Sequence, residues 1–192
     1  MTDITISPAR PEHAPYIAQA VLMAVGEEIE LSLAGGEDRR HLALEAFTEL
    51  AARTDSQYSY LNTLVATDAE GRVAGVLVSY DGARLLELRR SFFEVAARVL
   101  GLHFDDSLEA ETDPGEIYLD SLAVFPGYRG KGLAGRLIEA AAERHAGSGK
   151  PLGLLVDVPN TGAYRLYTRL GFGKAGERPF AGVMMDHLQR RL

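Results

Sequence analysis

The stretch with the clearest chemical potential is RGKGLA, residues 129–134, which follows an apolar run and precedes the helix-like segment LIEAAAERH. The first backbone N–H groups of a helix have no partner inside the helix and carry partial positive charge. Glycines let such a backbone approach a ligand, and Arg129 and Lys131 add charge. The stretch fits either a surface turn or an anion site for phosphate or pyrophosphate. Its spacing matches neither a Walker loop nor a GxGxxG dinucleotide loop.

A second motif lies about thirty residues downstream, in PNTGAYRLYTRLGFG, residues 159–173. Its pattern predicts a short helix that begins after Asn160 as the N-cap and ends before Gly171. Leu166 and Leu170 have the spacing of core residues on that helix. Tyr167 is open to two interpretations, because it can either pack in the core or contribute a phenol to a site.

Together these motifs resemble those of the GCN5-related N-acetyltransferase (GNAT) family. RGKGLA matches the family pattern Q/R-x-x-G-x-G/A, and the second motif matches N-x-x-A-x-x-L-Y-x-x-L-G-F. The resemblance covers residues 116–176 and is weaker for the start of the chain. It implies a mixed α/β fold whose central mixed sheet, flanked by helices, is splayed open beside the strand that ends at Val124.

The resemblance also implies that acetyl-CoA lies in this splay as a co-substrate. Family members hold the pantetheine arm through backbone groups of the strand and the pyrophosphate through backbone N–H groups of the glycine loop. Asn160 and Tyr167 match positions that lie near the pantetheine and the thioester. The expected cofactor-binding residues are therefore Leu122, Ala123, Val124, Arg129, Gly130, Lys131, Gly132, Leu133, Ala134, Gly135, Asn160 and Tyr167.

Tyr167 is the expected general acid, because a phenol with a pKa near ~10 stays protonated at neutral pH and can donate a proton to a departing thiolate. Family members commonly place a tyrosine here. The alternative is that Tyr167 only packs or orients the cofactor.

Asp120 is the expected base, because it lies in the apolar strand EIYLDSLAV, where an unpaired carboxylate would be costly to bury. Strict alternation would place Asp120 on one face with Tyr118 and Leu122. Asp120 can take a proton from the amine, anchor its positive charge, or play a structural role. Glu116 is a second candidate, expected at a solvated strand end.

The sequence thus predicts an acyl-CoA-dependent N-acetyltransferase that acts directly on a primary amine of a small molecule or peptide. The alternative is a non-catalytic acyl-CoA-binding regulatory protein of the same fold. In the family, acceptor specificity comes from helices and loops, here residues 25–60, 84–113 and 177–182. A homodimer is compatible with the resemblance, and the oligomeric state stays open.

Composition excludes several other classes of protein. The 192-residue chain has a net charge of −7, which argues against nucleic-acid binding, and it has no cysteine, which excludes disulfides, thiolate metal sites and a cysteine nucleophile. The five histidines show no metal-ligand spacing, so no metal is expected. Without a signal-like N-terminus or a membrane-length apolar run, we expect one cytoplasmic domain over residues 1–192 that binds no membrane.

Periodicity predicts the remaining elements. Strands are expected at residues 4–7, around 61–68, at 72–80, 116–124 and 152–158, with two short strands at 171–176 and 182–188. Helices are expected at residues 11–28, 37–53, 84–100, 131–145 and 161–170. Arg89 and Arg90 are expected on a solvated helix face. The side chains of Tyr58, Tyr60 and Tyr80 either line the acceptor pocket or pack in the core.

Overall fold

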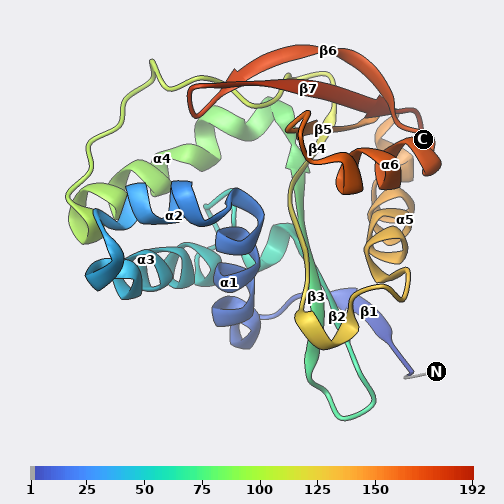
Figure 1. Cartoon of the computed structure of the whole chain (residues 1–192), viewed down its shortest axis with the longest axis horizontal. Helices are drawn as coiled ribbons and strands as arrows, with labels where there is room; N and C mark the ends of the chain where they lie inside the picture. The colour runs from blue at the N-terminus through green and yellow to red at the C-terminus, as the bar shows by residue number, and fades with distance from the viewer. Residues whose placement is uncertain (1–2) are drawn as a thin grey trace.

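The computed structural model describes residues 3–192, which form a seven-stranded mixed sheet with helices on both faces (Figure 1). Its order is β1-β2-β3-β4-β5-β7-β6, and all neighbours are antiparallel except the parallel pair β4–β5. This confirms the predicted mixed sheet. The strands are β1 (Thr5–Pro8), β2 (Thr63–Thr67), β3 (Val73–Asp81), β4 (Ile117–Val124), β5 (Leu152–Val156), β6 (Gly173–Phe180) and β7 (Val183–Arg190).

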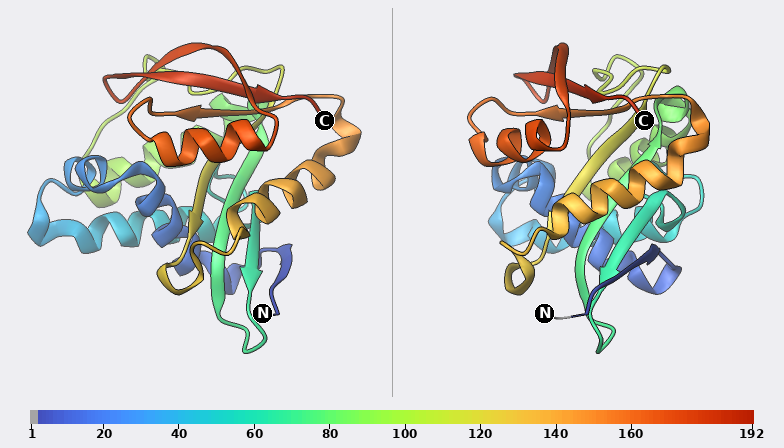
Figure 2. Two further views of the ribbon diagram at one scale, coloured as in Figure 1. Left: turned by 45° about the vertical axis from the view of Figure 1, so that its right-hand side comes forward. Right: turned by 90° about the vertical axis from the view of Figure 1, so that its right-hand side faces the viewer.

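The helices are distributed unequally over the sheet (Figure 2). Those of the first half of the chain lie on one side of β3 and β4, and α5 lies on the other. The helices are α1 (Ala14–Val25), α2 (Glu27–Ala34), α3 (Arg40–Ala52), α4 (Leu85–Val95), α5 (Leu133–His145) and α6 (Thr161–Arg169). A π-helical turn, Ala96–Leu100, extends α4.

The predicted single helix over residues 11–28 is wrong in its extent. Gly26 has φ 86° and ψ 163°, which lies far from helical values, so α1 ends at Val25 and a separate helix α2 begins at Glu27. Helix α2 also runs into the stretch before residue 37, where no helix is predicted, and it ends at the left-handed Gly35. This separation places α2 over the site described below.

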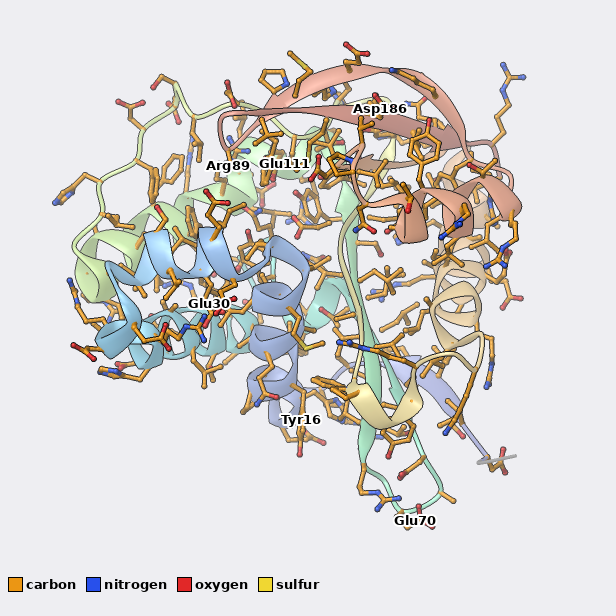
Figure 3. The ribbon with its side chains drawn as sticks, in the orientation of Figure 1. Tyr16, Glu30, Glu70, Arg89, Glu111 and Asp186 are labelled. Atoms are coloured by element: carbon orange, nitrogen blue, oxygen red, sulfur yellow. The ribbon has the colours of Figure 1, made fainter. Side chains whose placement is uncertain are left out.

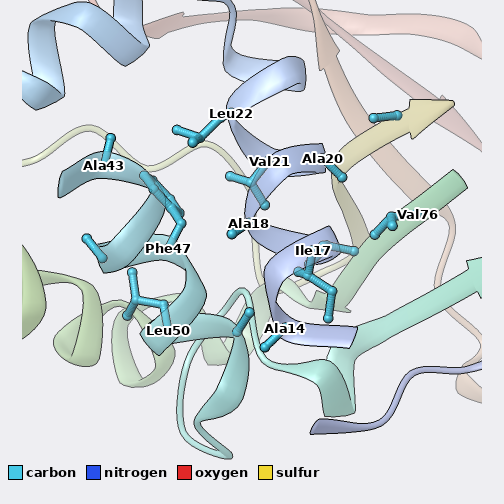
Figure 4. Close-up of a cluster of buried hydrophobic side chains, with 14 of the residues drawn as sticks. Ala14, Ile17, Ala18, Ala20, Val21, Leu22, Ala43, Phe47, Leu50 and Val76 are labelled. Atoms are coloured by element: carbon cyan, nitrogen blue, oxygen red, sulfur yellow. The ribbon is translucent and has the colours of Figure 1, made fainter. Parts of the chain in front are cut away.

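Two apolar clusters hold the sheet between the helices. Figure 4 shows the first, in which Ile17 and Val21 of α1 and Phe47 and Leu50 of α3 pack toward Val76 of β3. The second lies under α5 and contains Leu137 and Ile138, both fully buried. Truncating a large residue in such a cluster typically costs about 2–5 kcal/mol of stability. The central strands β3 and β4 are therefore fixed from both faces.

Strands β4 and β5 separate soon after they meet. They pair only at Ile117–Leu152 and Tyr118–Gly153, whereas β4 pairs with β3 along its whole length. Beyond Tyr118, the edge of β4 that faces β5 has no strand beside it among the described residues. The predicted splay is confirmed, and it leaves backbone groups of β4 free to bind an extended ligand.

A β-bulge in β4 changes the expected side-chain alternation. Val78 pairs with Ser121 and Ser79 with Leu119, so Asp120 is an extra residue without a partner on β3. As a result Leu122 packs in the α5 cluster, whereas Asp120 contacts residues on the opposite side of the sheet. The prediction that Asp120 and Leu122 share a face is wrong for this reason.

Candidate active site

One cavity of about 1000 Å³ connects the splay with the helices α1 to α4. Leu122, Asn160 and Tyr167 line it where β4 and β5 separate, and Asp120 lies on the same lining. All three segments expected to set acceptor specificity contribute residues, including Tyr58, and the β6–β7 hairpin contributes others. The structure therefore brings the two predicted catalytic side chains to one cavity.

Asp120 belongs to a hydrogen-bonded group with a second carboxylate, that of Glu111. The Tyr80 hydroxyl lies 3.1 Å from Glu111 Oε1 and 3.2 Å from Asp120 Oδ2. Gln57 Nε2 lies 3.3 Å and 3.4 Å from the same two oxygens. Ser121 Oγ donates to Asp120 Oδ1 at 2.7 Å. Because Tyr80 has only one hydroxyl proton, the two carboxylates share that proton.

Arg89 neutralises part of this charge from inside the protein. Its side chain is 4% exposed and pairs with Glu111 Oε2, and Figure 3 shows the two side chains next to each other. Its guanidinium also donates to the carbonyls of Leu108 at 3.0 Å and Glu109 at 2.9 Å. The prediction of a solvated face is wrong for Arg89, because it shares the buried stripe of α4 with Leu85 and Leu88. Arg90 is exposed, as expected.

The surroundings of Asp120 favour its neutral form more than water does. Burial and the neighbouring charge of Glu111 raise the pKa of Asp120 to about 6. Hydrogen bonds from Ser121, Tyr80 and Gln57 act in the opposite direction and limit the rise. A carboxylate with this pKa is mostly ionised at neutral pH, yet it is a stronger base than an ordinary aspartate.

Tyr167 lies across the cavity lining on α6, with its ring edge-on to Phe172 at a centroid distance of 5.8 Å. Burial raises the pKa of Tyr167 to about 12, so the phenol stays protonated over the whole physiological range. Within residues 3–192 its hydroxyl has no hydrogen-bond partner, which leaves the proton free for a ligand. Asn160 caps α6 through a 3.1 Å bond from the Ala163 N–H, as predicted.

The glycine loop lies at the other end of β4, outside the lining of this cavity. Gly130 (φ 73°) and Gly132 (φ 75°) have left-handed backbones, and a Cβ at either would meet nothing within 4 Å. No backbone N–H from residue 129 to residue 135 donates to another group among residues 3–192. A run of free N–H groups at the start of α5 suits an anion.

The charged side chains of this loop turn back onto its backbone. Arg129 Nε donates to the Val124 carbonyl at 2.9 Å, and Lys131 Nζ donates to the Gly127 carbonyl at 3.1 Å. Leu133 is buried in the α5 cluster and Ala123 in the α1 cluster, so only their backbones can reach a ligand. These two residues are thus confined to backbone contacts.

A partly buried hydrogen bond ties the loop to the β2–β3 hairpin. Tyr128 OH donates to Asp68 Oδ2 at 2.5 Å, and Asp68 also accepts from the Arg72 backbone at 2.9 Å. The bond from Tyr128, with those from Arg72, lowers the pKa of Asp68, so its carboxylate is ionised throughout the physiological range. Sequence reasoning missed Tyr128, which we place as a positioning residue for the glycine loop.

Glu116 is not a solvated end residue. Its side chain is 0% exposed, and its Oε2 accepts from His187 Nε2 and Gln189 Nε2, each at 2.8 Å. Its Oε1 accepts from Thr112 Oγ1 at 2.6 Å. Burial raises the pKa of Glu116, but these hydrogen bonds outweigh that effect, so its pKa lies below the ordinary value. Glu116 itself does not line the cavity, but its hydrogen bonds fix the end of the loop that carries Glu111.

Sequence reasoning missed Glu111 and Gln57, since neither lies in a recognisable motif. One signal was available for Glu111. Arg89 follows Leu85 by four positions and Leu88 directly, which places it on the buried stripe of α4, and a buried guanidinium requires an acid. The structure also distinguishes the three tyrosines that the sequence left open. Tyr58 lines the cavity, the Tyr80 hydroxyl bonds to both carboxylates, and Tyr60 packs against the α1 cluster.

Residues 3–192 lack two further kinds of feature. No group of three or more His, Cys, Asp or Glu side chains has metal-binding geometry there. In the same range, no helix combines the length and hydropathy needed to cross a membrane.

Comparison with known proteins gives a consistent result. A model of the acetyltransferase (GNAT) family matches residues 33–172. An acetyltransferase of Agrobacterium fabrum is 31% identical over 116 residues, which cover 60% of this chain and 84% of that protein. A crystal structure of an acetyltransferase is 31% identical, with a TM-score of 0.78 over 97% of this chain and 98% of the other. An N-acetyltransferase from Staphylococcus aureus Mu50 is 27% identical, with a TM-score of 0.82 over 97% and 100%.

Proposed function

Since the chain belongs to the acetyltransferase (GNAT) family, we propose that it transfers an acetyl group from acetyl-CoA directly to a primary amine of a small molecule or peptide. The observation that carries the proposal is the single cavity that joins the free edge of β4 to Asp120 and Tyr167. The similar protein from Staphylococcus aureus is an N-acetyltransferase, which supports an amine as the acceptor. We propose that residues 1–192 act as one catalytic domain.

The residues present fit acetyl-CoA, which would supply an activated acetyl thioester. The free N–H groups of residues 129–135 suit its pyrophosphate. The edge of β4 at Leu122, Ala123 and Val124, which no strand pairs and where only the Val124 carbonyl already accepts from Arg129, suits an extended pantetheine arm. Asn160 and Tyr167 lie on the lining of the cavity where that arm would end. Gly130 and Gly132 leave open space that a side chain would fill.

Asp120 receives the proton that the amine must lose. An ammonium near Asp120 Oδ2 is attracted by the charge of Asp120 and Glu111, of which Arg89 compensates only one unit. With its pKa raised to about 6, Asp120 is ionised at neutral pH and can accept a proton directly or through water.

Tyr167 supplies a proton at the other end of the reaction. The new bond joins the neutral amine nitrogen to the acetyl carbon while the carbon–sulfur bond breaks. The phenol of Tyr167 protonates the departing sulfur, and the second proton, which the nitrogen loses as it becomes an amide, restores the phenol through water. The raised pKa of Tyr167 keeps the donor form available. Without a cysteine in the chain, we propose direct transfer rather than a thioester on the protein.

The test is release of free thiol from acetyl-CoA in the presence of a panel of primary amines. The chain has no cysteine, so the protein gives no background signal. Thiol release that depends on one class of amine, with the acetylated amine found by mass spectrometry, is the expected result. Acetyl-CoA binding without turnover of any small or peptide amine would instead support the non-catalytic acyl-CoA-binding alternative.

A further inference from the structure

The lining of the cavity is strongly unbalanced in charge. Its acidic side chains are Glu27, Glu28, Glu109, Glu111, Asp120 and Asp157, whereas Arg89 is its only basic side chain. This balance is that of the described residues, 3–192, and Arg40, outside the lining, neutralises part of the charge of Glu27. A negative lining attracts cations and repels anions.

Arg89 offers nothing to an acidic ligand. Its guanidinium is buried and already engaged by the Glu111 carboxylate and by the carbonyls of Leu108 and Glu109. An acceptor that carries a carboxylate or a phosphate would therefore have no cation to pair with among the described residues of this cavity.

The start of α2 also disfavours anions. Residues 26–29 line the cavity, and the N-terminus of a helix would ordinarily attract negative charge. Here the first turn carries Glu27, Glu28 and Glu30, of which Glu27 and Glu30 pair with Arg40, so their charge is partly neutralised. Glu28, which has no ion pair among residues 3–192, therefore adds negative charge to the lining at this helix end.

Gln57 helps to hold the two carboxylates of the site in place. The residue is 3% exposed and lines the cavity, and its Nε2 is directed to the Glu111 and Asp120 carboxylates. Its Oε1 has no hydrogen-bond partner among residues 3–192. Rotating the amide would place Oε1 against two carboxylates, so the donor-inward orientation is the stable one. Gln57 therefore presents its amide donor to the two carboxylates, while its Oε1 is buried.

The rest of the wall near the helices is apolar and aromatic. Phe47 and Tyr58 pack with their ring centroids 5.0 Å apart, and Phe92 stacks on Phe104 at 5.3 Å. All four residues line the cavity, together with Ile29 and Leu33 of α2. Such a wall favours the body of an apolar molecule and leaves the hydroxyl groups of a sugar unpaired.

We propose that the acceptor is a primary amine with an apolar, aromatic or alkyl body and no acidic group. The ammonium lies at Asp120 and Glu111, and the body lies against the aromatic wall. This inference rests on the proposed function and narrows its acceptor to one chemical class. It excludes free amino acids and phosphorylated amines as preferred acceptors.

The test compares two molecules that share one aromatic body. Thiol release is measured with 2-phenylethylamine and with phenylalanine, which adds only a carboxylate. We expect kcat/KM to be higher for 2-phenylethylamine by on the order of 100-fold, because the added carboxylate meets like charges. Equal or better use of phenylalanine, with turnover otherwise intact, overturns the acceptor assignment and leaves the proposed function standing.

Binding is measured separately by calorimetry with N,N-dimethyl-2-phenylethylamine. This amine is cationic at neutral pH, but once its ammonium proton is lost its nitrogen carries no hydrogen that an acetyl group could replace. Binding of this amine is expected, and absence of binding overturns the inference. Binding combined with no thiol release from any amine supports the pocket assignment and contradicts catalysis. The two proposals therefore fail in distinguishable ways.

Reversing the charge of one lining residue tests the role of the acidic lining, and the same reversal outside the lining serves as its control. Glu28 is exposed, lines the cavity and has no hydrogen bond or ion pair among residues 3–192, so Glu28→Lys leaves the fold intact. We expect Glu28→Lys to raise KM for 2-phenylethylamine severalfold and to lower KM for phenylalanine, without changing KM for acetyl-CoA. Glu45→Lys, on an exposed position of α3 outside the lining, should change none of these. Identical effects of both substitutions would overturn the inference.

Discussion

The carboxylate of Glu116 occupies the space that a side chain at Gly153 would need: a Cβ on Gly153 would lie 1.7 Å from Glu116 Oε2. Gly153 is also one of only two residues of β5 that pair with β4. The point where the two strands meet is therefore fixed by a glycine and a buried acid. Everything beyond it, including the splay, depends on this junction.

Gly153→Ala should destabilise the fold by about 2–4 kcal/mol, because the methyl group must displace Glu116 from its hydrogen bonds. Urea unfolding followed by circular dichroism measures the change. Gly173→Ala is the matched control, since a Cβ at Gly173 would meet nothing within 4 Å. Equal stability of the two variants would contradict the described packing.

Asp120 should control the acidic side of the pH–rate profile. Since its pKa is raised to about 6 and the base must be ionised, kcat/KM should rise as pH increases through about 6 and then level off. Asp120→Asn should lower kcat about 100-fold or more and abolish that rise. A profile that keeps the same inflection in Asp120→Asn would exclude this carboxylate as the base.

Asp120→Asn, which should lower activity, should raise the stability of the fold. The raised pKa means that the folded state binds the Asp120 proton more tightly than the unfolded state, so the free energy of unfolding decreases as pH rises from about 4 to about 6. The ionised carboxylate therefore costs up to about 3 kcal/mol at pH 8. Asp120→Asn should raise the unfolding free energy at pH 8, and by less at pH 4, in urea titrations at the two pH values.

Tyr167→Phe should reduce kcat by about 100-fold while the Kd for acetyl-CoA stays within about twofold, because only the proton donor is lost. Kd is measured by calorimetry and kcat by thiol release. Tyr164→Phe is the control on the same helix, as Tyr164 does not line the cavity. Unchanged turnover in Tyr167→Phe would remove this phenol from the mechanism.

Tyr128→Phe should raise KM for acetyl-CoA severalfold without raising KM for the amine, because the bond to Asp68 that positions the glycine loop is lost. Loss of this hydrogen bond to the Asp68 carboxylate should also lower the stability of the fold slightly. Steady-state kinetics with each substrate varied in turn separates the two constants. A rise in the amine KM alone would contradict a positioning role.

Local sequence patterns predicted the features that depend on local chemistry. The β2–β3 hairpin, the N-cap Asn160 and the glycine-rich start of α5 all follow from residue types at short spacing, and the structure has them where expected. The resemblance then supplied the splay, which no periodicity in the chain indicates.

Features that depend on distant parts of the chain could not be predicted in this way. Glu111 and Glu116 are both acids near a long loop, and only tertiary contacts bury one against Arg89 and the other against His187. The C-terminal strands β6 and β7 are longer than predicted. Their extra residues pair with each other through the backbone but do not show the alternating apolar pattern by which a strand is predicted. Gly26 falls inside a predicted helix, since its conformation is set by how α1 and α2 pack.

The unpaired position of Asp120 means that β4 counts one residue more than β3 along the shared ladder. This extra residue sets which face of the sheet the side chains on either side of it point to, so the two halves of β4 each keep their apolar side chains in the core because it is there. Any residue substituted at this position keeps that count, whereas deleting it would reverse the inward and outward faces of one half of the strand. A point substitution at position 120 can therefore change the chemistry of the site without changing the register of β4. An insertion or deletion there would turn apolar side chains out of the cores on the two faces of the sheet and would therefore destabilise the fold.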